Sequence, residues 1–89
     1  MTPQQREQIR LSVLRYCESA SQYGLSAELL QQFLRSEGFR AVTVEQVGTE
    51  LQYLADKELI AEVAKLISPE IPVWRITAAG RDHVAKQNF

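Results

Sequence analysis

The spacing of apolar residues along this chain changes once, close to residue 58. Before that point, apolar side chains recur every three or four positions, which is typical of helices that bury one face. After it, residues 59–67 and 73–77 form short runs rich in Ile, Val, Leu and Trp, a composition that favours strands. A chain of 89 residues is the size of one domain with one core. The sequence therefore predicts a single, mainly α domain of the α+β class, with three helices before a β-hairpin.

Capping residues place the ends of the helices. Thr2 suits the start of a first helix, and Ser26 suits the start of a second that ends at Gly38. Thr43, with Gln46 three residues later, has the pattern of a capping box. Two prolines between residues 68 and 72 mark the turn of the hairpin, because both cannot lie in a central strand. The predicted elements are helices at residues 3–22, 27–37, 44–57 and 78–87 and a hairpin at residues 59–77.

The passage from the hairpin to the last helix carries the most specific motif. Trp74, Ile76, Thr77, Gly80 and Val84 have the spacing aromatic-x-aliphatic-Thr-x-x-Gly-x-x-x-aliphatic. This resembles aromatic-x-Leu-Thr-x-x-Gly-x-x-x-Leu, with which many winged-helix families end the hairpin that forms their wing. We expect Trp74 and Ile76 to point into the core, Thr77 to cap the last helix, and Gly80 to allow close backbone packing. The order of elements is also that of a winged helix-turn-helix domain, so the resemblance covers nearly the whole chain.

A second motif, residues 54–60, resembles the end of a recognition helix that runs into the first strand of a wing. A glycine usually precedes the Leu-Ile pair at residues 59 and 60, and this chain has Glu58 there. In its small size the chain is also similar to accessory winged-helix proteins of bacteriophages.

The resemblance implies that the helix at residues 44–57 enters the major groove of double-stranded DNA. Its predicted outward positions carry side chains that can contact bases or phosphates, namely Gln46, Thr49, Glu50, Gln52 and Tyr53. Lys65 and Arg75 in the hairpin are further candidates for DNA contacts. Arg40, which precedes the helix, is either a phosphate contact or a solvated loop charge.

Charge favours an alternative function. The chain has a formal net charge of -1, and residues 39–57 carry two basic against three acidic side chains. Residues 58–72 carry one basic and three acidic side chains, although phosphate contacts need a basic surface. The alternative is a protein-interaction or assembly module that does not bind DNA, with Tyr53 at the centre of its contact face, because tyrosine is a common interface anchor. The sequence leaves both hypotheses open.

Leu11 and Leu14 are predicted on the outer side of the first helix, where they suggest a homodimer contact. Cys17, on the apolar face, is predicted to lie in the core, and a lone cysteine fits a reducing cytoplasm. His83 is predicted to be a surface or half-buried packing residue. No sequence motif indicates an enzyme, a cofactor, a metal site, a small-molecule substrate or a membrane span. The chain is therefore expected to act by binding in the cytoplasm.

Overall fold

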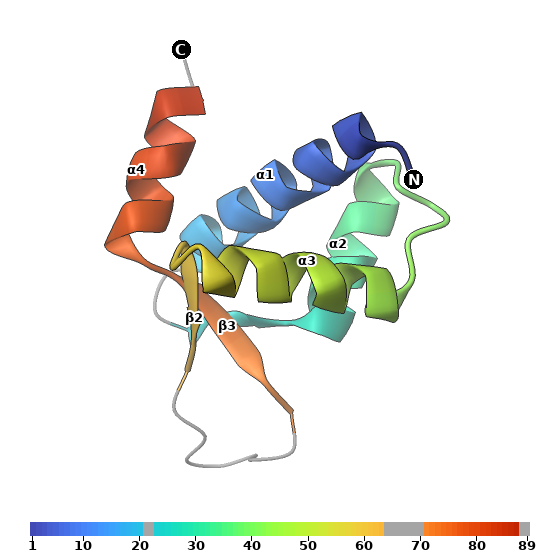
Figure 1. Cartoon of the computed structure of the whole chain (residues 1–89). Helices are drawn as coiled ribbons and strands as arrows, with labels where there is room; N and C mark the ends of the chain where they lie inside the picture. Colours follow the sequence, from blue (N-terminus) through green and yellow to red (C-terminus); the bar gives the residue numbers. More distant parts are fainter. Residues whose placement is uncertain (21–22, 64–70, 88–89) are drawn as a thin grey trace.

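The computed structural model describes residues 1–20, 23–63 and 71–87, arranged as helices around a small sheet (Figure 1). The protein measures 36 × 28 × 21 Å along its principal axes. In chain order the elements are α1 (Pro3–Ala20), β1 (Leu25–Ser26), α2 (Ala27–Glu37), α3 (Val44–Asp56), β2 (Ile60–Glu62), β3 (Val73–Ile76) and α4 (Ala78–Gln87).

The sheet has three antiparallel strands in the order β1-β3-β2, where the sequence predicted two. Strands β2 and β3 form the expected hairpin, with Ile60 opposite Ile76. The added strand, β1, pairs Leu25 with Trp74 on the other edge of β3. Two residues are too few to show an alternating pattern, so no periodic signal predicts this strand.

The core forms around α1, which packs against the other three helices and against β1 and β3. The buried part of the α1 surface is consequently wider than the single apolar face of a helix that packs on one side only. Leu14 is 1% exposed and belongs to the core, so its predicted outward position is wrong. Leu11 is half-buried. The pair therefore does not form an apolar patch on the outside of α1, and the predicted dimer contact loses its basis.

The junction between α3, β2 and α4 explains the motif at residues 74–84. The Thr77 hydroxyl donates to the Glu58 carbonyl oxygen at 2.7 Å and accepts from the Gly80 amide at 3.1 Å, which caps α4 as expected. A Cβ atom on Gly80 would lie 2.2 Å from the Leu59 carbonyl oxygen. Gly80 is thus required because two backbone segments meet there.

The residue in the usual glycine position, Glu58, adopts a left-handed conformation with φ of 63°. Its amide donates to the Ala55 carbonyl, and the Leu59 amide donates to the Leu54 carbonyl, both at 2.9 Å. These two bonds form a Schellman motif at the end of α3. The backbone therefore keeps the turn that favours glycine, although the side chain is that of glutamate.

Cys17 lies in the core and is fully buried, as predicted. Burial raises the pKa of its thiol from 9.0 to about 12, because the thiolate loses its hydration. The unfolded chain therefore ionises this thiol at a lower pH than the folded chain does. The stability that follows is fully present below pH 9 and is lost as the pH rises toward 12.

We expect the stability advantage of the wild type over Cys17→Ala to shrink by about 1.4 kcal/mol between pH 7.5 and pH 10, since one pH unit above the unfolded pKa corresponds to that free energy. Urea unfolding of both proteins at the two pH values measures the difference. Tyr16, whose pKa is also raised to about 12 by burial and by its hydrogen bond to Glu37, is common to both proteins and cancels. An advantage that stays constant with pH would contradict the expectation.

Candidate binding surface

The outer side of α3 carries a stripe of polar side chains, defined by Glu45, Thr49, Gln52 and Asp56, all of which are exposed. The Thr49 hydroxyl donates to the Glu45 carbonyl at 3.0 Å, and the Gln52 amide donates to the Asp56 carboxylate at 2.9 Å. The stripe therefore presents two neutral hydrogen-bonding groups between two carboxylates.

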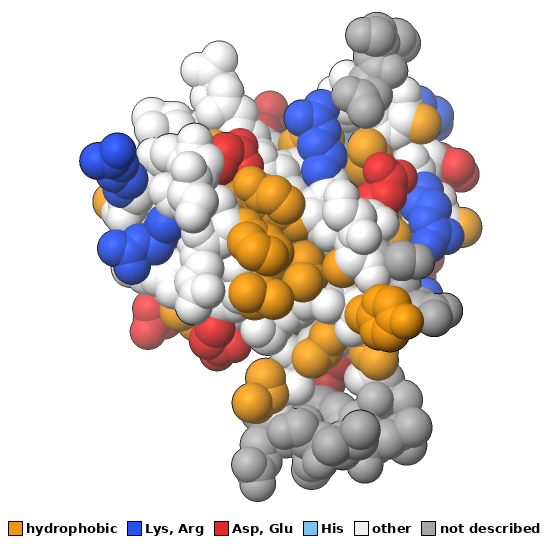
Figure 2. All heavy atoms as spheres, turned by 180° about the vertical axis from the view of Figure 1, so that it is seen from behind, with side chains coloured by type: hydrophobic (Ala, Val, Ile, Leu, Met, Phe, Trp, Pro, Cys, Tyr) orange, Lys and Arg blue, Asp and Glu red, His pale blue; other side chains and the backbone are white. Residues whose placement is uncertain are grey.

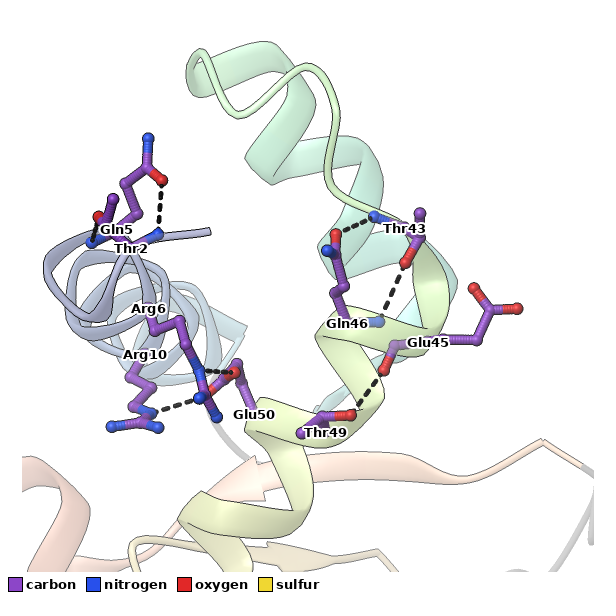
Figure 3. A network of polar contacts seen from close by, with 9 residues as sticks. All are labelled: Thr2, Gln5, Arg6, Arg10, Thr43, Glu45, Gln46, Thr49 and Glu50. Atoms are coloured by element: carbon purple, nitrogen blue, oxygen red, sulfur yellow. Dashed lines mark hydrogen bonds and ion pairs between the residues drawn. The ribbon is translucent and has the colours of Figure 1, made fainter.

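Gln46 has a structural task at the start of α3. Its side-chain oxygen accepts from the Thr43 amide at 3.0 Å, while the Thr43 hydroxyl accepts from the Gln46 amide at 3.1 Å (Figure 3). This confirms the predicted capping box. Because its oxygen is engaged in the cap, Gln46 is less available to read bases than the sequence suggested.

Glu50 is the main correction to the predicted site. The side chain is buried, at 1% exposure, and points away from the outer side of α3 toward α1 (Figure 3). Its two carboxylate oxygens accept from Arg10 at 2.6 Å and from Arg6 at 2.9 Å. Glu50 is therefore an internal counter-ion, and its predicted place on an exposed recognition face is wrong.

Arg6 and Arg10 are basic side chains of α1. The structure commits one nitrogen of each to Glu50, so the carboxylate offsets one of the two positive charges. Because Glu50 is buried, the surface of α3 carries less negative charge than the sequence of this helix suggests. Because Arg6 and Arg10 are paired with Glu50, α1 likewise offers less positive charge to a phosphate.

Tyr53 lies at the edge of the polar stripe next to α1, and so is not at its centre as predicted. The ring is 40% exposed, and the Arg10 guanidinium sits over it at 3.7 Å from the ring centroid. The Lys57 ammonium lies 5.7 Å from the same centroid. Both distances are within the range of a cation–π contact, so Tyr53 holds cationic groups beside α3.

The remaining predicted site residues do not belong to α3. Arg40 is exposed in the turn between α2 and α3, and Arg75 is exposed on β3 opposite Ala61. Lys65 lies outside the described residues. The structure thus brings Thr49 and Gln52 together on one surface, with Tyr53 at its edge, and leaves the two arginines on neighbouring elements.

The comparisons with known proteins address the fold. The sequence matches no protein-family model and no curated protein. A solved structure described as GAS PerR-Zn-Zn superposes with a TM-score of 0.62 and 18% sequence identity over 85% of this chain. The match covers 43% of that neighbour, so this chain corresponds to less than half of it. The fold is that of a winged helix. In this fold α2 and α3 form the helix-turn-helix, and β2 and β3 form the wing.

The name of the neighbour includes zinc. Within residues 1–20, 23–63 and 71–87 of the present chain, no group of three His, Cys, Asp or Glu side chains is placed to hold a metal ion. Over the same residues no helix is both long and apolar enough to cross a membrane.

Proposed function

We propose that this winged-helix protein acts without catalysis by binding double-stranded DNA, as a regulatory protein does. The observation that carries the proposal is the exposed pair Thr49 and Gln52 on the outer side of α3, the second helix of the helix-turn-helix. In such domains this helix enters the major groove. Hydroxyl and carboxamide groups can hydrogen-bond to base edges there. A glutamine matches adenine in a bidentate manner, and Gln52 would give up its exposed hydrogen bond to Asp56 to do so.

The charges around Thr49 and Gln52 favour weak binding to DNA. Arg40 is exposed in the turn before α3 and Arg75 is exposed on β3 of the wing, and both side chains are candidates for phosphate contacts. The carboxylates of Glu45 and Asp56 repel phosphates on the stripe itself. With few phosphate contacts, the non-specific affinity is expected at the weak end of the usual range, a Kd of roughly 10⁻⁴ M at physiological salt.

A protein-interaction module is the second candidate, and a specific observation favours it. Leu29 and Phe33 of α2 are each 37% exposed, and the Phe33 ring contacts that of Tyr16 with 5.2 Å between centroids. Figure 2 shows hydrophobic side chains gathered in the middle of the face opposite to that of Figure 1. Exposed apolar groups of this kind commonly mark contacts with another protein.

Fluorescence anisotropy of a labelled duplex of random sequence separates the two candidates. At low salt we expect micromolar binding that weakens steeply as salt is added, because phosphate contacts release counter-ions. Arg75→Ala should weaken binding. It should also reduce the magnitude of the negative slope of log K against log salt by about 1, as expected for one lost phosphate contact. Lys86→Ala, on the exposed side of α4, is the matched control and should leave the slope unchanged.

The absence of binding at low salt would overturn the DNA proposal, because nearly every DNA reader has this non-specific affinity. The protein-interaction candidate would then take its place. Phe33→Ser, at the exposed apolar face, would be the variant with which to test capture of a partner, while Tyr53→Ala would test the edge of α3.

A further inference from the structure

A groove between α1, α3 and α4 lies beside the polar stripe and shares the Tyr53 ring with its edge. It encloses about 650 Å³ and is partly open to solvent. Figure 1 shows α1 and α4 diverging from each other above α3. The volume lies within the range of about 300–1,000 Å³ that is usual for small-molecule sites.

The lining of the groove is partly apolar and partly polar, with cationic groups among the polar ones and with Gln4, Gln8, His83 and Gln87 as further polar side chains. Leu11, Leu54 and Leu59, one from α1, one from α3 and one from the segment after α3, supply the apolar part. Arg10, Lys57 and the Tyr53 ring also line it. A compound that fills this groove therefore meets hydrophobic surface and positive charge together.

The positive charge is held in place and is not fully neutralised. Arg10 donates from Nε to Glu50 and rests on the Tyr53 ring, which fixes the guanidinium while its two terminal NH₂ groups keep further donor capacity. Lys57 has no ion pair among the described residues. Glu7 is the acidic side chain that lines the groove.

From this combination we propose that the groove is a binding site for a small organic anion with a planar apolar body. The anionic group lies against Arg10 and Lys57, and the apolar body lies against the three leucines and the edge of Tyr53. A guanidinium that is already oriented loses little conformational freedom when it binds a carboxylate, which favours an anion over a neutral compound. The proposal does not depend on DNA binding.

Titration calorimetry with 1-naphthoate tests the site on the full chain without DNA. We expect 1-naphthoate to bind at least tenfold more tightly than 1-naphthalenemethanol, which has the same ring system and no charge. Lys57→Gln should weaken 1-naphthoate binding about tenfold and leave 1-naphthalenemethanol unaffected. Lys86→Gln, which also removes one lysine charge but from outside the groove, should bind both compounds like the wild type.

Circular dichroism spectra that match the wild type would show that each variant is folded. Equal affinities for the two naphthalene compounds, or an unchanged affinity in Lys57→Gln, would overturn the proposal. A third outcome would also overturn the proposal. If the affinity for 1-naphthoate fell as the protein concentration rose, and sedimentation showed a dimer over the same range, the groove would be filled by a second copy of the chain. None of these titrations contains DNA, so their failure is independent of any failure of the anisotropy experiment.

Discussion

Replacing both Arg6 and Arg10 by methionine is expected to lower the free energy of unfolding by about 3 to 5 kcal/mol, the usual cost when a buried ion pair loses one side. The carboxylate of Glu50 is 1% exposed and accepts from these two arginines. Methionine keeps much of the apolar volume of arginine but supplies no donor. The charged Glu50 would then be buried with neither water nor counter-ion. Urea unfolding followed by far-UV circular dichroism measures the loss.

The triple variant with Glu50→Leu is the matched control. It removes the buried carboxylate together with the arginines, and we expect it to regain at least half of the lost stability, since a buried ion pair can be replaced by apolar residues at little cost. If the triple variant were as unstable as the double one, the loss would come from missing packing of the arginine side chains and not from an unpaired carboxylate.

Gly80→Ala is expected to be destabilising by about 3 kcal/mol, at the upper end of the cost of overpacking. The added Cβ would lie 2.2 Å from the Leu59 carbonyl oxygen and 2.7 Å from Ile76 Cγ1. A backbone carbonyl cannot rotate away as a side-chain end can, so α4 would have to move off the junction. Denaturant unfolding followed by Trp74 fluorescence and by circular dichroism reports this loss.

The same substitution at Gly48 is expected to have the opposite effect on the free energy of unfolding. Gly48 is inside α3, and a Cβ there would have no heavy atom within 4 Å. Because alanine is favoured over glycine in a helix, Gly48→Ala should raise stability by about 0.5–1 kcal/mol. Equal effects of the two substitutions would contradict the close backbone contact at Gly80.

The helices, the hairpin and the Thr77–Gly80 junction were predictable because each has a local signal in period, cap or motif. The position of Glu50 had a signal too, although it was missed. Arg6 and Arg10 lie on the same stripe of α1 as the core residues Val13 and Cys17, at spacings of four, seven and eleven residues. Two cations at the end of a buried stripe require a carboxylate on the helix that covers it.

Other features depend on the tertiary structure alone. Leu14 is buried because several elements surround α1, which the period of α1 by itself does not reveal. Strand β1 exists because β3 offers a free edge at Trp74, 49 positions further along the chain than Leu25. The period of α3 likewise does not reveal that Tyr53 is next to α1, where Arg10 lies over its ring.

The strand order β1-β3-β2 also bears on how this protein emerges from the ribosome. The middle strand is the last of the three to be synthesised, and both others pair with it and not with each other. A nascent chain that ends before residue 73 therefore has its three N-terminal helices but cannot close its sheet. Leu25 and Ile60, both buried in the finished sheet, stay without their strand partners until residues 73–76 have left the exit tunnel. Completion of the sheet is thus expected only after β3 has emerged, as one step that joins both edges to β3.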